Sequence, residues 1–202
     1  GDARGTLTVL SASQGTFSDR RQIASFLGME QDDLRVVLIP AGGGFGGKED
    51  LSVQPHAALA AVLCDAPVNV TFSRAESILV HPKRHAMDVT MSLGCDGEGR
   101  LTFCEADVLA DTGAYASLGA EVVERATVHA TGPYRFQAVR LEGHTVYTNN
   151  PPAGAMRGFG VPQVAFAVEA LVDRLADAAG VDRLEIRAIN GLRPGWAFST
   201  GQ

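Results

Sequence analysis

Hydrophobic and polar positions along the first forty residues predict a strand, a helix and a second strand. The run Thr6 to Leu10 is a short strand signal, and a β-branched run fills 34–40. Between them, Ile23, Phe26 and Leu27 recur at helical spacing, which predicts a helix from Ser18, its expected cap, to Leu27. Gly28 follows directly and is placed to end that helix.

The middle of the chain combines a helix pattern with a clear hairpin pattern. An alanine-rich run over 52–63 predicts a helix, and 68–72 predicts a short strand. Strict alternation over 87–93 predicts a half-buried strand, and the turn residues of 96–99 return the chain into a second strand over 101–110. We therefore expect a long antiparallel hairpin.

The rest of the chain continues the alternation of strands and helices. The buried phase changes within the second hairpin strand, which indicates a β-bulge near 104–105. A short helix is expected over 122–129, a strand over 139–147, a long amphipathic helix over 162–179 and a helix over 182–190. The pattern predicts an α+β fold, with mixed sheets, helices packed on them and glycine-rich loops at strand-to-helix junctions.

Composition and charge narrow the class of protein. The chain has 202 residues, of which 46% are hydrophobic and 20% are charged, which suits one large globular domain or two small lobes. The net charge of −6 and the lack of a basic cluster argue against a nucleic-acid partner. No apolar run is long enough for a membrane span.

The cysteines and the chain ends indicate the setting. Cys64, Cys95 and Cys104 lack the spacing of metal ligands or of a disulfide framework, so we expect thiols of a reducing, cytoplasmic compartment. No signal peptide opens the chain. It begins without Met and ends on a loop-like segment, so we expect a fragment.

The candidate chemistry centres on a glycine-rich loop over 41–50. Its five glycines are Gly42, Gly43, Gly44, Gly46 and Gly47. Such residues let the backbone approach a ligand closely, and successive free N–H groups form an anion-binding concavity. We interpret the loop as a backbone cradle for an anionic or oxo group, with Phe45 held inside it.

The same loop also fits two nucleotide-binding patterns. Gly42, Gly44 and Gly47 have the spacing of the dinucleotide fingerprint, with Asp65 downstream. A Walker loop fits less well, because Glu49 stands where Ser or Thr holds magnesium. A nucleotide-binding module that uses the Gly42–Gly47 loop is therefore an alternative, and it predicts a parallel sheet.

A second loop of this kind, Ala-Met-Arg-Gly-Phe-Gly over 155–160, also encloses a Phe just before a helix. With both loops, the chain resembles the molybdenum-cofactor subunit of the xanthine dehydrogenase and aldehyde oxidase family, and within it the large subunits of bacterial xanthine dehydrogenases. The matching segments occur in the family's order and cover nearly the whole chain: 11–15, 42–49, 111–115, 124–126 and 155–163.

The resemblance implies a molybdenum hydroxylase whose first molybdopterin-binding lobe is residues 1–202. The metal would be held by the pterin dithiolene and not by protein side chains. Iron–sulfur clusters and FAD would lie on partner domains or subunits, and the remaining half of the molybdenum subunit would be a further partner. The substrate would be a purine, such as hypoxanthine or xanthine, or another heterocycle, with an aldehyde as the alternative.

The resemblance also implies roles for residues around the cofactor. Gln14 matches the side chain that hydrogen-bonds the molybdenum oxo ligand. Gly44, Phe45 and Gly46 match the loop whose backbone N–H groups meet that centre. Such N–H groups are fixed dipoles that stabilise negative charge on a ligand oxygen. Arg157 matches the residue whose loop touches the cofactor from the other side.

Three further residues match substrate-side positions of the family. Glu49 matches the carboxylate that hydrogen-bonds a purine, and Arg125 matches the guanidinium that offsets negative charge developing on it. Phe159 matches the ring that stacks on a flat substrate. Because an aldehyde needs neither the carboxylate nor the guanidinium, these residues favour a purine.

The family's general base lies beyond the last residue of this chain, so we expect the chain alone to be inactive. A scaffold lobe that only assembles with other subunits is not distinguished from this by the sequence. Two other clusters favour ordinary surface roles. His81 and His85 lack a nearby third ligand, and Glu169, Asp173 and Asp177 fit a solvated helix face.

Overall fold

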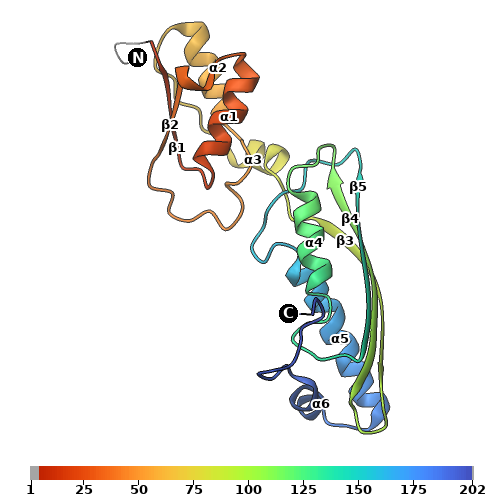
Figure 1. The fold of residues 1–202 in the computed structure, drawn as a ribbon. Helices are drawn as coiled ribbons and strands as arrows, with labels where there is room; N and C mark the ends of the chain where they lie inside the picture. The colour runs from red at the N-terminus through yellow and green to blue at the C-terminus, as the bar shows by residue number, and fades with distance from the viewer. Residues whose placement is uncertain (1–4, 202) are drawn as a thin grey trace. The chain divides into compact units, whose positions relative to one another are not determined.

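The computed structural model describes residues 5–201 and divides them into two compact units (Figure 1). Unit 1 runs to Arg84 and also contains residues 154–157, and unit 2 comprises 85–153 and the residues from 158 onwards. The expected mixture of helices with mixed sheets is confirmed. In chain order the elements are β1 (Leu7–Ser11), α1 (Thr16–Leu27), η1 (Gln31–Asp33), β2 (Leu34–Leu38), α2 (Gln54–Cys64), α3 (Arg74–Val80), β3 (Ala86–Cys95), β4 (Leu101–Gly113), α4 (Gly119–Val128), β5 (Ala138–Tyr147), α5 (Val161–Ala179) and α6 (Arg183–Asn190).

Unit 1 is built on two parallel strands, β1 and β2, which are joined through α1. Helices α1 and α2 cover one face of the strand pair (Figure 1). The core between them consists of small and branched side chains, because the alanine-rich α2 lets the helices approach the strands closely. Its buried residues are Val9, Ile23, Ala24, Leu34 and Ala58.

The start of α1 differs from the expectation, and its end agrees with it. The helix begins at Thr16 after Gly15, so Ser18 lies inside the first turn and is not the cap. Gly28 ends the helix in the left-handed conformation, and its N–H is directed at the carbonyls of Ala24 and Ser25, as predicted.

The strand expected over 68–72 is wrong. That segment pairs with no strand in the described part of the chain, and a strand needs a partner for its backbone groups. A helix follows instead, α3, which the apolar pattern did not reveal. Ser73 and Glu76 start it with a reciprocal capping box, in which the Ser73 hydroxyl accepts from the Glu76 N–H and the Glu76 carboxylate accepts from the Ser73 N–H.

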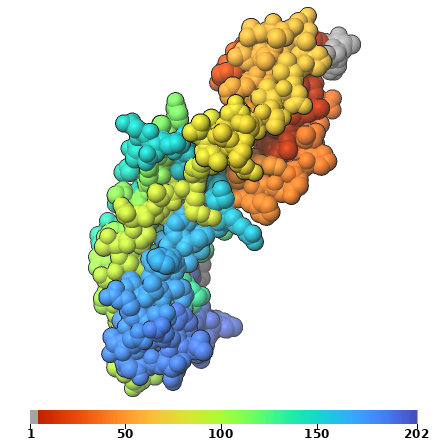
Figure 2. Space-filling view, turned by 180° about the vertical axis from the view of Figure 1, so that it is seen from behind, coloured from red at the N-terminus to blue at the C-terminus, as the bar shows by residue number. Residues whose placement is uncertain are grey.

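Unit 2 is a three-stranded sheet in the order β3-β4-β5, with α4 and α5 packed on one face (Figure 1). The expected hairpin of β3 and β4 is antiparallel, whereas β5 pairs with β4 in parallel. Viewed from behind, the C-terminal helices form much of the surface of unit 2 (Figure 2). The buried residues between α4, α5 and the sheet are Ala106, Val108, Ala126, Ala130 and Val164.

The expected bulge in β4 exists but lies earlier than predicted. Gly94 pairs with Phe103 and Cys95 pairs with Leu101, so Thr102 is the extra residue. Leu101 and Cys104 are both buried, three positions apart, because the added residue shifts the alternation. The sequence indicated the change of phase from the residues beyond it and therefore placed the bulge too late.

The acidic face of α5 is not simply solvated, which corrects the expectation. Arg187 of α6 donates to Glu169 and forms an ion pair with Asp173, with N–O distances of 2.7 Å and 2.8 Å. Arg183 pairs with Asp177 at 2.6 Å. These pairs hold α6 against α5. Tyr134 also donates to Glu169 at 2.7 Å, and burial, together with that carboxylate, raises the pKa of Tyr134 to about 12.

A buried amide joins α6 to the sheet of unit 2. Asn190 accepts a hydrogen bond from the Leu101 N–H at 2.9 Å and donates to the carbonyls of Gly99 and Ile186 at 2.8 Å and 2.7 Å. The side chain thus satisfies two backbone groups at the bulged end of the hairpin and one within α6.

We predict that Asn190→Ala destabilises unit 2 by roughly 2–4 kcal/mol, because it leaves these buried backbone groups without partners. Urea unfolding followed by the fluorescence of Trp196, the only tryptophan in the chain and part of unit 2, measures the change. Asn149→Ala, at an exposed position, is the control and should cost less than about 0.5 kcal/mol. Equal effects of the two substitutions would contradict the role of Asn190.

We predict that Asp19→Asn stabilises the protein at pH 7. Asp19 is fully buried in the first turn of α1, and burial raises its pKa above the ordinary 3.8, with only partial compensation from the Ser13 hydroxyl. The stability that this group contributes is present below about pH 3.8 and is lost as the pH rises through its raised folded pKa. Thermal melts at pH 4 and pH 7 should show the gain in Tm only at the higher pH. A variant that is less stable than the native protein at pH 7 would contradict this assignment.

Candidate functional site

The first glycine loop folds as two overlapping turns. The Gly47 N–H donates to the Gly44 carbonyl at 2.9 Å, and the Glu49 N–H donates to the Gly46 carbonyl at 3.3 Å. Phe45 is the second residue of the first turn and lies in the left-handed region, with φ of 54°. A bulky residue adopts that conformation rarely and at an energetic cost, and such strain gathers at functional sites.

Gln14 is bound to this loop through four hydrogen bonds. Its backbone N–H donates to the Lys48 carbonyl at 2.9 Å. Its side-chain Oε1 accepts from the backbone N–H groups of Gly46 and Lys48, at 2.9 Å and 3.3 Å. Its Nε2 donates to Oε1 of Glu49 at 2.8 Å. Two main-chain donors therefore converge on one oxygen atom, which is the arrangement that binds an oxo or anionic group.

Two glycines of the loop cannot carry a side chain without displacing a neighbour. A Cβ on Gly44 would lie 2.1 Å from Oε1 of Gln14. A Cβ on Gly46 would lie 2.9 Å from the carbonyl carbon of Ala155, and Gly46 also has φ of 89°. The absence of a side chain at Gly44 therefore leaves room for the Gln14 carboxamide, and its absence at Gly46 leaves room for the backbone of Ala155.

The segment 154–157 lies against this loop within unit 1. The Gly154 N–H donates to the Lys83 carbonyl at 2.9 Å, and Arg84 donates to the Arg157 carbonyl at 2.8 Å. The Arg157 guanidinium carbon lies 5.7 Å from the centre of the Phe45 ring, within the range of a cation–π contact. Arg84 belongs to none of the motifs in the sequence and was not predicted as a site residue.

Six of the eight predicted site residues thus come together in unit 1. They are Gln14, Gly44, Phe45, Gly46, Glu49 and Arg157. Phe45 is 65% exposed and Glu49 is half-buried, so the ring lies at the surface beside the converging N–H groups, while Oε1 of Glu49 accepts from Gln14.

The other two predicted residues, Arg125 and Phe159, belong to unit 2. Phe159 repeats the backbone of Phe45, with φ of 52° between two left-handed glycines, Gly158 and Gly160. A Cβ on Gly160 would lie 2.4 Å from the Val122 carbonyl oxygen of α4. The second loop therefore packs directly on the helix whose exposed face carries Arg125.

The segment 111–115, one of those that resemble the family, acts here as a brace. Asp111 accepts hydrogen bonds from the Thr148 hydroxyl, the Asn150 amide and the Gly113 N–H, at 2.7 Å, 2.5 Å and 2.7 Å. These bonds, led by that of Thr148, hold the pKa of Asp111 below its ordinary value. The carboxylate fixes the end of β4 to the segment after β5.

The geometry disfavours the dinucleotide alternative. In that fingerprint the third glycine packs at the start of the helix that receives the phosphates. Here α2 begins at Gln54, seven residues after Gly47, and Asp65 is the exposed residue that ends this helix. The loop's own turns, and not the start of a helix, make its N–H groups converge.

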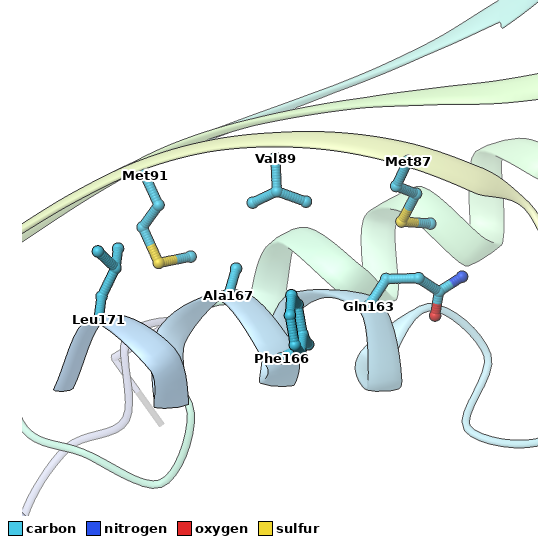
Figure 3. A pocket seen from close by; sticks show the side chains of 7 residues that line it. All are labelled: Met87, Val89, Met91, Gln163, Phe166, Ala167 and Leu171. Carbon is cyan, nitrogen blue, oxygen red and sulfur yellow. The ribbon is translucent and has the colours of Figure 1, made fainter. Parts of the chain in front are cut away.

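A groove in unit 2 lies between β3 and α5 and contains none of the predicted site residues (Figure 3). It has a volume of about 360 Å³, and its only amide-bearing lining residue is Gln163. That side chain donates to the His85 carbonyl at 3.1 Å. The lining residues are Met87, Val89, Met91, Gln163, Phe166, Ala167 and Leu171.

Two further observations concern metal and membrane. Among residues 5–201, no three His, Cys, Asp or Glu side chains gather in a way that could hold a metal ion. Within the same residues, none of the helices combines the length and the apolar character that crossing a bilayer requires.

Comparison with known proteins gives consistent matches. Residues 1–191 match the family model described as the molybdopterin cofactor-binding domain. The nicotinate dehydrogenase large molybdopterin subunit of Eubacterium barkeri is 44% identical over the whole chain, which spans 47% of that subunit. The xanthine dehydrogenase molybdenum-binding subunit of Escherichia coli is 39% identical over 94% of the chain, which spans 25% of that protein.

A solved structure shares the fold. The aldehyde oxidoreductase of Desulfovibrio gigas superposes over the whole chain with a TM-score of 0.94 and 33% identity, and the chain spans 22% of it. The chain thus spans less than half of each of these relatives. The chain belongs to the molybdopterin cofactor-binding domain family, within the large subunits of the xanthine dehydrogenase and aldehyde oxidoreductase group.

Proposed function

We propose that this chain is the first molybdopterin-binding lobe of an enzyme that hydroxylates an electron-poor nitrogen heterocycle, with a purine such as hypoxanthine or xanthine as the substrate. The observation that carries the proposal is the convergence of the Gly46 and Lys48 N–H groups beside the left-handed Phe45. When bound, the molybdenum–pterin group supplies the oxidising centre at which a ring C–H becomes C–OH.

The residues of unit 1 fit such a group. The two converging N–H groups suit an oxygen that carries negative charge, because their dipoles are fixed by the backbone of the loop. Gly46 has no Cβ to hold the segment 155–157 away, so main chain approaches from the other side. Arg157 adds a positive charge over the Phe45 ring. Gln14 and the loop 44–46 are the residues that would hold the group.

The preference for a purine rests on Glu49. Its half-buried carboxylate lies next to the cradle and can accept a hydrogen bond from a ring N–H, which an aldehyde lacks. For Arg125 and Phe159, we propose the charge-offsetting and stacking roles that the resemblance implies. The similar identities to a nicotinate and a xanthine dehydrogenase keep a pyridine ring as the second candidate substrate.

The partners we propose are the remaining half of the molybdenum subunit and subunits that carry iron–sulfur clusters and FAD. One observation supports the first of these. Parallel strands are normally covered on both faces. In unit 1, α1 and α2 cover one face of β1 and β2, while Leu10 on the other face is 65% exposed.

The free thiols of Cys64, Cys95 and Cys104 suit a reducing, cytoplasmic setting.

We predict that Gly46→Ala in the full-length protein weakens cofactor retention by roughly tenfold or more, because the new Cβ meets the Ala155 backbone. Gly42→Ala is the matched control, because Gly42 is also left-handed, with φ of 65°, but has no atom within 4 Å of the new Cβ. Molybdenum and pterin content per protein measure the effect. Equal cofactor retention in the two variants would contradict the proposal that the loop around Gly46 holds the cofactor.

We predict that Glu49→Ala lowers kcat/KM for xanthine by roughly 10- to 100-fold, because one buried polar contact to the ring is lost. Turnover of benzaldehyde by the same assembled enzyme should change less than about threefold, since that substrate has no ring N–H. Glu30→Ala, at an exposed position of unit 1, is the control. If the native enzyme oxidises benzaldehyde or nicotinate but no purine, the purine assignment is wrong.

A further inference from the structure

We propose that the Gln14 carboxamide is an internal competitor for the cradle, and that cofactor binding exchanges it outward and thereby releases Glu49. This inference rests on the proposed function, because it concerns how the same cradle is filled. It assigns to Gln14 a conformational role in addition to contact with the bound group.

The orientation of the carboxamide follows from its partners. The two groups facing its Oε1, the backbone N–H groups of Gly46 and Lys48, are donors only. The group facing its Nε2 is a carboxylate oxygen of Glu49. If the amide were turned the other way, its NH₂ would face the two backbone N–H groups and its carbonyl would face the Glu49 carboxylate. All three hydrogen bonds would then be lost.

The carbonyl oxygen of Gln14 therefore takes the position in which the cradle would hold a ligand oxygen. Each main-chain N–H carries one hydrogen, so an oxygen of the cofactor and Oε1 of Gln14 compete for the same two donors. An anionic oxygen accepts stronger hydrogen bonds than a neutral amide does, so the exchange favours the ligand.

The shape of the loop is matched to this carboxamide. Gly44 lies where any Cβ would come within 2.1 Å of Oε1 and 2.4 Å of the carboxamide carbon. Gln14 itself is exposed, so its side chain has room to leave the loop by rotation about its own bonds. The backbone bond from the Gln14 N–H to the Lys48 carbonyl is independent of that rotation and keeps the residue beside the loop.

Movement of the carboxamide has a consequence for Glu49. Nε2 and Oε1 of Gln14 belong to one rigid amide group, so Gln14 cannot leave the N–H groups and keep its bond to Glu49 unchanged. Departure of the amide exposes the Glu49 oxygen that now accepts from it at 2.8 Å. Filling of the cradle thus makes the carboxylate available to a substrate donor, and the NH₂ of Gln14 becomes free to face the new ligand.

Hydrogen exchange of the full-length protein, measured by mass spectrometry on peptides that cover residues 44–50, tests the proposal. Without cofactor, Gln14→Ala should speed exchange of the Gly46 and Lys48 amides by about fivefold or more, because both lose their acceptor. The Gly47 and Glu49 amides, which donate within the loop, should be unchanged. Gln22→Ala, on the exposed face of α1, is the control and should leave all four amides unchanged.

The second arm uses extracted molybdopterin cofactor and a carbodiimide that labels carboxylates. Cofactor should restore protection of the Gly46 and Lys48 amides in Gln14→Ala, and Glu49 should be labelled about threefold faster or more in the cofactor-free variant than in the native protein. Equal protection of these amides in cofactor-free native and variant protein, or equal labelling of Glu49, would overturn the inference alone. Failure of the native protein to bind cofactor would overturn the proposed function and the exchange step with it.

Discussion

The left-handed backbone at Phe45 is the constraint on which the candidate site depends. With φ of 54° at Phe45 and positive φ at Gly42, Gly43 and Gly46, the chain turns tightly enough to direct two N–H groups at a single oxygen. In an extended strand the N–H groups of residues 46 and 48 would point to the same side but lie about 7 Å apart, and in a helix they would point along parallel lines, so neither backbone would bring them to one atom. The cost of holding a Phe in this conformation is offset by the hydrogen bonds of Gln14 and by the contact of Arg157 with the ring.

The same device occurs again in unit 2, where Phe159 lies between Gly158 and Gly160. In each unit, a glycine beside the Phe allows close main-chain packing. Gly46 lies against the Ala155 carbonyl, and Gly160 lies against the Val122 carbonyl. The chain thus reaches two unusual backbone conformations by surrounding a bulky ring with residues that have no side chain.

The candidate site contains two kinds of polar group: backbone N–H groups and side chains. Backbone N–H groups recognise charge and do not distinguish one substrate from another, which agrees with the different substrates named for the relatives: nicotinate, xanthine and an aldehyde. Under the proposed function, selection among substrates would come from side chains such as Glu49, whose carboxylate accepts a hydrogen bond from Gln14 in the structure.

Many of the helices, strands and loops could be predicted from the sequence, because the signals for them lie in neighbouring residues. Alternation gave the hairpin of β3 and β4, glycines gave the end of α1 and the two Phe-bearing loops, and Asp182 gave the start of α6. Tertiary structure decided what depends on partners distant in the chain. Residues 68–72 have strand propensity but no neighbour to pair with in the part of the chain that is described, and the acidic face of α5 is paired with arginines of α6. The closure of Gln14 on a loop more than thirty positions away, and its bond to Glu49, arise from hydrogen bonds that no local pattern encodes.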